Sequence, residues 1–500
     1  MEKTVQNRVT NVENAVYEVA NELLKAYNQG TFSVGGLLMD LEGNVLYKQH
    51  NNVITDNLIH DPTAHGERQM VDWYFENKAT LSLPEPENII LVTSLDPCVM
   101  CTGSILQAGF ARVIVSALDS HAGINYDMSA TFPALSGTAM QLEAQQRFAY
   151  PKVHSSTKMF ERKATSADIS CSFKADTTID EQAYASTSIT LSATLGTTIV
   201  SALDTHAGIN YDMSTTPPAL PGTAMQLEAQ QRSTYPKVHS PTKMFEREAT
   251  GADISCFFKA GTTIDEQTYA LTSIAFSATL DTISKKINTD LPEDQLKNPT
   301  CLSKDNPIYT ALKEVYPQAL EYTAPHPNQP DAGLAPYLIT AAKEDLLNGG
   351  EGNAVAFLDC FGNLIMCSPG NQNLSEIQTP FILATRKYAA LRYSLQLANT
   401  PDASYYLGHP KYGTFIYAKS LELNPQGVVD LGAFGSTMGG KIPTDREQFQ
   451  FAVSRVEQCK LDAFTDGLPP LYSSKDFVNI RLKQVQSHKL IKALKAGLPD

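Results

Sequence analysis

Two short motifs constrain the fold of this chain more than any other feature: DPTAHGE at residues 61–67 and DPCVMC at residues 96–101. A fold that uses both motifs must bring the imidazole of His65 next to the thiols of Cys98 and Cys101, about thirty residues further along the chain. These side chains are typical zinc ligands, and a catalytic zinc has three protein ligands so that water can take the fourth position. The two motifs therefore predict a water-activating zinc site.

Both motifs also contain residues that typically begin helices. Pro97 suits a helix start that places both thiols on the first turn, where free backbone N–H groups favour negatively charged sulfur. DPTAH likewise precedes an expected helix, so that His65 and Glu67 lie near its first turn. A carboxylate beside an activated water can take its proton and pass it on. Glu67 is therefore the predicted catalytic residue.

Other interpretations of the two motifs remain open. A closed, structural zinc site would need a fourth ligand, and the sequence has no second CxxC pair to supply it. A redox CxxC pair would not need the HxE motif upstream. Glu67 alone would usually be a solvated charge on a helix, but its position two residues after His65 favours the catalytic role.

H-x-E followed by P-C-x-x-C is the signature of zinc-dependent base deaminases. The first 130 or so residues resemble the cytidine and deoxycytidylate deaminase superfamily, in the branch of guanine deaminase, fungal-type cytosine deaminase and tRNA adenosine deaminase. That branch reads DPTAHAE and EPCxMC, so Gly66 replaces Ala and Asp96 replaces Glu here. The resemblance covers about a quarter of the chain. It implies an α/β, three-layer α/β/α cytidine deaminase-like fold with a mixed central sheet, and Zn2+ as the cofactor.

The activity implied by the resemblance is hydrolytic deamination of a nucleobase or nucleoside, with zinc-bound water as the nucleophile and Glu67 as the proton shuttle. The sequence HNNV at residues 50–53 favours guanine or a related purine as the substrate, with cytosine or cytidine next. Two alternatives remain. One is deamination of adenosine in tRNA or another nucleic acid, and the other is a zinc-containing binding or scaffold protein without turnover.

An Asn upstream of the metal-binding His holds the substrate base in the branch that the chain resembles. Asn51 is the first candidate here and Asn52 the second, and Asn57 stays open because residues 54–60 make the spacing about three residues longer than the family pattern. A polar turn after a strand is the alternative account of the first two. Backbone donors around Ala64 are further expected substrate contacts.

Downstream of the second motif, the resemblance places a segment that closes the pocket. HAGINYDM occupies this place, and it contains His121, Asn125 and Tyr126 as candidate lid or specificity residues. Packing of a loop is the alternative role for all three. The family does not carry the repeat in which this segment occurs.

The repeat is a tandem duplication. Residues 114–198 recur as residues 199–283 at a constant offset of 85, with roughly four positions in five identical. Two units are too few for a solenoid. The first unit overlaps the end of the predicted deaminase domain, residues 1–150, and neither unit contains HxE or CxxC. The duplication therefore adds no second metal site.

A polar linker is expected at residues 284–299, followed by a second α/β domain at residues 300–500. Residues 353–373 repeat the predicted order of strand, turn and strand found at residues 33–52. The helix expected next does not begin with an HxE motif. NPQGVVDLG, at 424–432, occupies the place of the CxxC motif. We predict a degenerate deaminase-like domain, with an unrelated α/β domain as the alternative.

Charge and apolar content narrow the expected partners. A net charge of −14 disfavours binding to long nucleic acid, which usually requires a basic surface, and only residues 481–495 are locally basic, in a pattern that suits a terminal helix. No apolar run reaches the length of a membrane span or a signal peptide core. We therefore expect a cytoplasmic protein with a small-molecule partner. The resemblance also implies a homo-oligomer or an internal pseudo-dimer.

Overall fold

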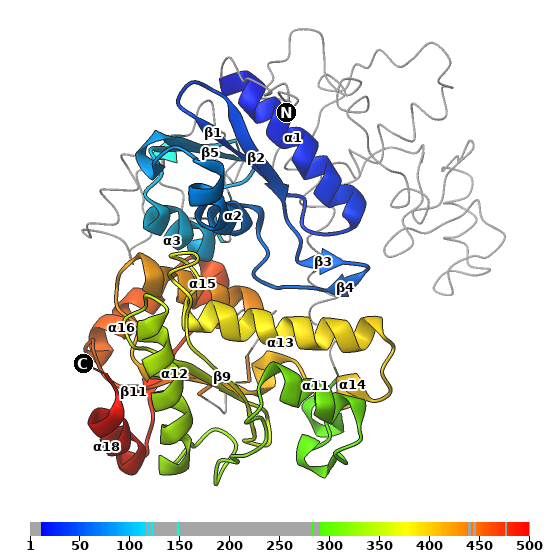
Figure 1. The fold of residues 1–500 in the computed structure, drawn as a ribbon, viewed down its shortest axis with the longest axis vertical. Coiled ribbons are helices and arrows are strands. Elements are labelled where there is room, and N and C mark those ends of the chain that lie inside the picture. The colour runs from blue at the N-terminus through cyan, green and yellow to red at the C-terminus, as the bar shows by residue number, and fades with distance from the viewer. Residues whose placement is uncertain are drawn as a thin grey trace, which may run out of the picture.

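The computed structural model describes residues 12–116, 119, 122–123, 148–149, 283, 291–438, 442–443, 447–475 and 478–499. These residues form two α/β layers that lie against each other, one N-terminal and one C-terminal (Figure 1). The duplicated units fall almost entirely outside the described residues. In the described part of the chain, no helix has the length and apolar character needed to cross a membrane. The expected cytoplasmic location stays a prediction.

The N-terminal layer alternates helices and strands, as the sequence predicts. In chain order its elements are α1 (Val12–Gln29), β1 (Gly35–Asp40), β2 (Val45–His50), β3 (Ile54–Thr55), β4 (Leu58–Ile59), α2 (Gly66–Leu81), a 3-10 turn (Pro86–Asn88), β5 (Ile89–Thr93), α3 (Val99–Ala108), β6 (Arg112–Val115) and β7 (Phe148–Ala149). Five strands form one sheet in the order β2-β1-β5-β6-β7. The pairs on either side of β1 are antiparallel and the pairs on either side of β6 are parallel, so the sheet is mixed.

Helices cover both faces of this sheet because successive side chains of a strand point to opposite faces. Leu37 and Met39 of β1 pack in one cluster with Val19 of α1. Leu38, between them, packs in a second cluster with Met70 of α2. Every residue of β1 and β5 is buried, as expected for strands that helices cover on both faces of the sheet. The expected α/β fold with a mixed sheet is confirmed.

The C-terminal layer also alternates helices and strands. In chain order its main elements are α11 (Pro307–Val315), α12 (Ala335–Leu347), β8 (Val355–Leu358), β9 (Leu364–Ser368), α13 (Pro380–Leu397), α14 (Ala403–Tyr406), β10 (Thr414–Lys419), α15 (Pro425–Met438), β11 (Phe449–Val453), α16 (Gln458–Asp466), α17 (Pro470–Ser473), β12 (Leu482–Gln484) and α18 (His488–Gly497). Short 3-10 turns connect some of them. Lys297, in the predicted linker, donates its backbone N–H to the carbonyl of Tyr405 at 2.7 Å and so contacts this layer.

The two sheets have the same strand order and the same strand directions. The C-terminal sheet reads β9-β8-β10-β11-β12, with β8 antiparallel to both neighbours and β11 parallel to both. The first strand of each sheet also has one register irregularity, between Leu38 and Met39 in β1 and between Phe357 and Leu358 in β8. Helices α13 and α15 therefore follow their strands as α2 and α3 do in the N-terminal layer.

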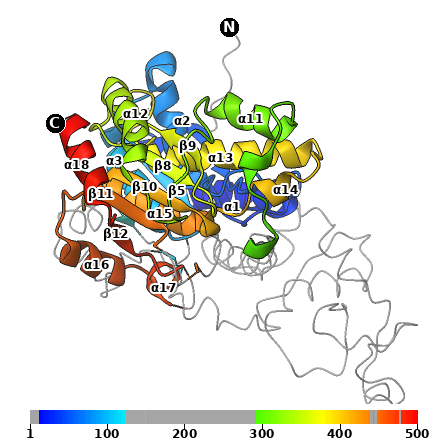
Figure 2. The same ribbon diagram turned by 90° about the horizontal axis from the view of Figure 1, so that it is seen from below.

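The two layers meet at the equivalent helices α3 and α15, which lie side by side in both views (Figures 1 and 2). A Cβ atom on Gly103 of α3 would lie 2.6 Å from the backbone nitrogen of Val429. One on Gly432 of α15 would lie 2.0 Å from the backbone nitrogen of Met100. Only glycine permits this approach of two backbones. One hydrophobic cluster consequently includes residues of both layers.

The lengthened loop before DPTAH forms the β3–β4 hairpin, which lies against α13 of the C-terminal layer (Figure 1). Asp56 and Asn57 at its tip have φ angles of 50° and 61°, which is the backbone of a type I′ turn. The Asp56 carboxylate accepts a hydrogen bond from the Tyr393 hydroxyl at 2.6 Å. The ring of His60 meets that of Tyr393 edge-on at 4.9 Å. The additional residues of this loop therefore contact the second layer.

Candidate metal centre

The three predicted ligands converge. The ligand atoms of His65, Cys98 and Cys101 all lie within 4.8 Å of one another, and His65 Nδ1 is 3.5 Å from Cys98 Sγ. His65 and Cys98 each occupy the position that precedes a helix, α2 and α3 respectively, with extended backbone. Cys101 lies on the first turn of α3. One imidazole nitrogen and two thiols at these separations fit a tetrahedral zinc ion with a fourth position left open.

The two thiols differ in acidity. A hydrogen bond from Cys101, together with the charge of His65, holds the pKa of Cys98 well below its usual value. Burial and the hydrogen bond to Cys98 raise the pKa of Cys101 well above its usual value. Cys98 is therefore the more acidic thiol of the pair in the absence of metal. Zinc binding would release the protons that the thiols carry, because zinc binds cysteine as thiolate.

Glu67 lies beside the ligands without being one of them. Its side chain is buried, with Oε1 accepting a hydrogen bond from the Thr93 hydroxyl at 2.8 Å and Oε2 3.5 Å from Cys101 Sγ. Burial, followed by the negative charge of Cys98, raises the pKa of this carboxyl group. A carboxyl group that binds a proton more readily than usual is suited to proton transfer. The catalytic role of Glu67 stays a prediction.

The first candidate for holding a substrate, Asn51, is buried at the end of β2. Its Oδ1 accepts hydrogen bonds from the Thr31 hydroxyl at 2.6 Å and from the backbone N–H of Val53 at 2.9 Å. These bonds fix the orientation of the amide, with its oxygen toward Thr31. The predicted contact of Asn51 with substrate stays a prediction.

The other substrate candidates have different surroundings. The backbone N–H of Asn52 donates to the carbonyl of Ala64 at 2.8 Å, which ties the end of β2 to the DPTAH loop. The backbone N–H of Ala64 donates to the carbonyl of Asp61 at 3.0 Å. Asn57 is at the hairpin tip. Their substrate contacts also stay predictions, and the remaining candidates lie outside the described residues: His121, Asn125 and Tyr126.

Sequence reasoning missed a buried group of charges directly behind the DPTAH loop. Arg68 is only 2% exposed, with Nη1 2.5 Å from Asp72 Oδ2 and Nη2 3.2 Å from Asp61 Oδ2. Arg386, on α13 of the other layer, lies against the same two carboxylates. The signal available in the sequence was limited to Asp61 and Arg68, which flank His65 with opposite charges.

Sequence reasoning also missed a contact on the cysteine side of the centre. Tyr472, on α17 of the C-terminal layer, is buried, and burial together with the negative charge of Cys98 raises the pKa of its hydroxyl. Its ring lies against Gly435 of α15, where a Cβ atom would be 2.3 Å from the ring carbon Cδ1. Both motifs of the metal centre are therefore contacted from the C-terminal layer.

The equivalent place in the C-terminal layer carries different chemistry. Thr379 precedes α13 as His65 precedes α2, and its hydroxyl donates to the buried carboxylate of Asp430. The Tyr417 hydroxyl donates to the other oxygen of Asp430 at 2.8 Å. Burial raises the pKa of Asp430 to about 7. This place therefore contains a hydrogen-bonded carboxyl group instead of an imidazole and two thiols.

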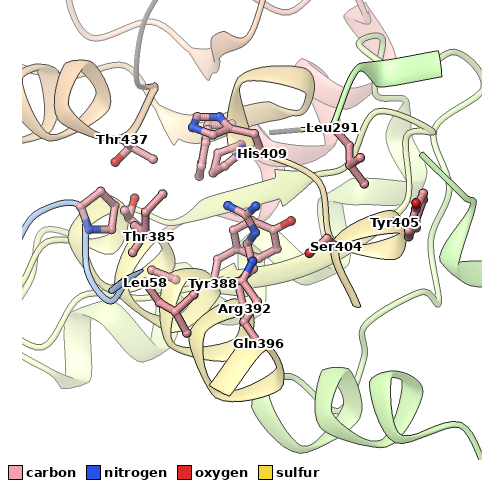
Figure 3. Close-up of a pocket in the computed structure, with 15 residues that line it drawn as sticks. Leu58, Leu291, Thr385, Tyr388, Arg392, Gln396, Ser404, Tyr405, His409 and Thr437 are labelled. Atoms are coloured by element: carbon pink, nitrogen blue, oxygen red, sulfur yellow. The ribbon is translucent and has the colours of Figure 1, made fainter. Parts of the chain in front are cut away.

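A cavity of about 370 Å3 lies between the β4 region and α13 (Figure 3). Its wall includes Leu58 and Pro62 from the N-terminal layer and Thr385 and His409 from the C-terminal one. Among the described residues that line it, none belongs to the predicted metal or substrate site. The cavity is therefore distinct from the metal centre, although Pro62 connects the two through the DPTAH loop.

Comparisons with known proteins point to one family. Residues 10–117 match the family described as the cytidine and deoxycytidylate deaminase zinc-binding region. The tRNA-specific adenosine deaminase of Aquifex aeolicus is 33% identical over 104 residues, 21% of this chain and 64% of that protein. The cytosine deaminase of Candida albicans is 33% identical over 91 residues, 18% of this chain and 56% of that protein. The tRNA-specific adenosine deaminase of Haemophilus influenzae is 30% identical over 122 residues, 23% of this chain and 67% of that protein.

The chain thus spans 64% and 56% of the length of the first two relatives. A structure from a study of tRNA:A34 deaminases is 21% identical, with 27% of this chain and 94% of that chain covered and a TM-score of 0.20. A guanine deaminase from Nitrosomonas europaea is 16% identical, with 29% and 78% covered and a TM-score of 0.21. The matched family region binds zinc and the three ligand atoms converge, so the expected cofactor, zinc, is confirmed.

Proposed function

The chain belongs to the cytidine and deoxycytidylate deaminase superfamily, and on this basis we propose that it hydrolyses the exocyclic amino group of a nucleobase or nucleoside. The observation that carries the proposal is the placement of the Glu67 carboxyl group beside the convergent ligands His65, Cys98 and Cys101. Three ligands and an adjacent proton carrier are what hydrolysis at a ring carbon requires.

The residues of the chain have separable tasks in this reaction. A zinc ion held by His65, Cys98 and Cys101 would supply Lewis acidity that activates water for attack. Glu67 takes one proton from the attacking water and passes it to the ring nitrogen as the new C–O bond forms. It then takes the proton of the hydroxyl group added to the ring carbon and passes it to the amino group, which leaves as ammonia when the C–N bond breaks. Thr93 holds one carboxylate oxygen of Glu67 and so orients the other toward the reacting atoms.

The substrate that we favour is free guanine or a related purine, followed by cytosine or cytidine. Glu67 is 4% exposed and Asn51 is 2% exposed, a degree of burial that suits a base enclosed by the protein. The sequence HNNV before DPTAH favours guanine as the substrate, and a net charge of −14 disfavours a nucleic-acid substrate. The names of the Aquifex and Haemophilus relatives favour the alternative function, deamination of adenosine in tRNA.

We also propose that the C-terminal layer is a deaminase-like domain without metal ligands, so that the chain is an internal pseudo-dimer. The shared strand order, strand directions and register irregularity support this proposal. Thr379, Asn424 and Gly427 stand where the N-terminal layer has His65, Cys98 and Cys101, counted from the starts of the equivalent helices. None of these three residues offers a zinc ligand of the usual kind.

The proposal predicts ammonia release from one of five substrates offered to the zinc-loaded full chain: guanine, cytosine, cytidine, adenosine and tRNA. Glu67→Gln should reduce turnover by roughly a hundredfold or more, since it removes the proton carrier, and leave bound zinc unchanged. Glu85→Gln, at an exposed carboxylate paired with Lys78, is the matched control and should keep full activity. Absence of turnover with every substrate would favour the scaffold alternative, and full activity in Glu67→Gln would refute the mechanism.

A further inference from the structure

We infer that Arg386, on α13 of the C-terminal layer, is a positioning residue for the DPTAH loop, and that the second layer thereby holds the metal-binding His65 in place. The inference rests on the proposed function only where its test measures turnover. It assigns a task to a layer whose described residues contain no cluster of metal ligands.

The charges around Arg68 do not balance within the N-terminal layer. Asp61 and Asp72 are both buried, and the guanidinium of Arg68 lies between them and contacts both. Two carboxylates and one guanidinium leave one negative charge in a buried place, which is costly unless it is paired. Arg386 supplies the missing positive charge, with Nη1 3.3 Å from Asp72 Oδ2 and Nε 3.7 Å from Asp61 Oδ2.

A second contact between the layers supports the same docking. Gln378, which is buried just before α13, donates a hydrogen bond from Nε2 to Glu76 Oε1 at 3.0 Å. Glu76 lies one turn beyond Asp72 on α2 and also interacts with the charge of Arg386. The start of α13 therefore contacts α2 at two places, and the position of Arg386 relative to Asp72 is fixed by more than one bond.

The charge cluster is connected directly to the metal ligand. Asp61 Oδ1 accepts hydrogen bonds from the backbone N–H and the hydroxyl of Thr63 at 2.8 and 2.7 Å, and Arg68 Nε donates to the Thr63 carbonyl. His65 lies between these anchored residues, two positions after Thr63 and three before Arg68. A shift of Asp61 would therefore displace the imidazole of His65, and the carboxylate of Glu67 with it.

Both the charge and the shape of Arg386 matter for this task. A guanidinium has several donors in a fixed planar fork and can contact two carboxylates at once, whereas an ammonium acts as a compact charge on a flexible stem. The contact between α3 and α15 and their common hydrophobic cluster involve neither Arg386 nor Asp61. Loss of Arg386 should therefore loosen the loop while the two layers stay together.

The test compares Arg386→Gln and Arg386→Lys with the wild type in the full chain. Arg455→Gln is the matched control, since Arg455 is equally an arginine in ion pairs but its ion pairs are with Glu351 and Glu422, within the C-terminal layer. Three quantities are measured: the zinc dissociation constant by chelator competition, kcat and KM separately, and the free energy of unfolding in urea.

For Arg386→Gln we expect zinc affinity to fall by roughly tenfold to a hundredfold, as is usual when a group that orients a ligand is removed. We expect kcat to fall by a factor on the order of ten to a hundred, because displacement of catalytic groups by about 1 Å has effects of this size, with a smaller change in KM. Arg386→Lys should recover part of both losses, and Arg455→Gln should resemble the wild type.

The inference is overturned if Arg386→Gln keeps the zinc affinity of the wild type, even where its stability falls, because Arg386 would then only join the layers. The zinc measurement decides this point even if the wild type turns over none of the substrates. Failure of the proposed function can therefore be distinguished from failure of this inference. If Arg386→Gln does not fold, Arg386→Lys decides in its place, and zinc affinity equal to that of the wild type would overturn the inference.

Discussion

Asp430 shows, at the scale of single residues, how the C-terminal layer accommodates a buried carboxyl group without a metal. Two hydroxyl groups, those of Thr379 and Tyr417, donate to its two oxygens. These bonds stabilise the charged form, but burial opposes it more strongly and raises the pKa from 3.8 to about 7. The group therefore carries a proton under mildly acidic conditions in the folded protein and loses it in the unfolded chain.

The stability of the protein should consequently depend on pH through Asp430. Between pH values near 4 and 7 the unfolded state releases the proton that the folded state keeps, so this contribution is complete below the unfolded pKa and is lost as pH rises through the folded one. The difference in unfolding free energy between the wild type and Asp430→Asn should fall by up to about 1.4 kcal/mol per pH unit in this interval. Urea unfolding at several pH values measures it, and parallel pH profiles for the two proteins would contradict the assignment.

Residue identity in the metal centre could be predicted because ligand chemistry is specific to residue type. An imidazole and two thiols in the HxE and PCxxC contexts have few other uses, so the convergence of His65, Cys98 and Cys101 is predictable from the sequence. Arg386 could not be found in this way, since it is 314 positions from Asp72 and arginine is a common surface residue. Its role depends on a tertiary contact between layers, for which the sequence offers no local pattern.

Among the elements, the long strands and helices were predictable from apolar periodicity and helix-start residues, whereas short ones were not. The lengthened loop became the two-residue strands β3 and β4 around a type I′ turn, too short for any period to be recognised. The basic stretch at 481–495 was expected as a helix; this is correct for α18 but wrong for Leu482–Gln484, which is the edge strand β12. Pairing with β11 decides the conformation of those three residues.

The crossing of α3 and α15 is the element-level contact on which the association of the layers depends most. Gly432→Val should destabilise the protein by about 3 kcal/mol, because the added atoms would meet the backbone of Met100, which cannot move aside as a side chain could. Ser436→Val, one turn later on α15 and half-buried, is the control for the β-branched residue and should cost less than about 1 kcal/mol. The free energy of unfolding in urea measures both changes. Equal losses in the two variants would refute the close approach.

At the scale of the whole molecule, the two layers resemble separate domains in topology but share one core. Each has its own five-stranded sheet. The largest hydrophobic cluster nevertheless joins residues of both, among them Met100 and Phe110 of the N-terminal layer and Phe381 and Phe434 of the C-terminal one. Topology alone would predict two folding units, whereas the continuous core favours one. The metal centre lies close to this junction, so its integrity should depend on both layers.

The shared core predicts a single cooperative unfolding transition, which the one tryptophan of the chain can test. Trp73, on α2, stacks on Tyr47 of β2 with ring centroids 4.2 Å apart, so its fluorescence reports on the packing of these two N-terminal elements. Far-UV circular dichroism reports on the helices of both layers. The two signals should give the same midpoint in urea, because unfolding of one layer would expose the apolar surface that the other buries. A tryptophan midpoint separate from the circular dichroism midpoint would mean that the layers unfold independently, and the pseudo-dimer would then lack the coupling that the shared core implies.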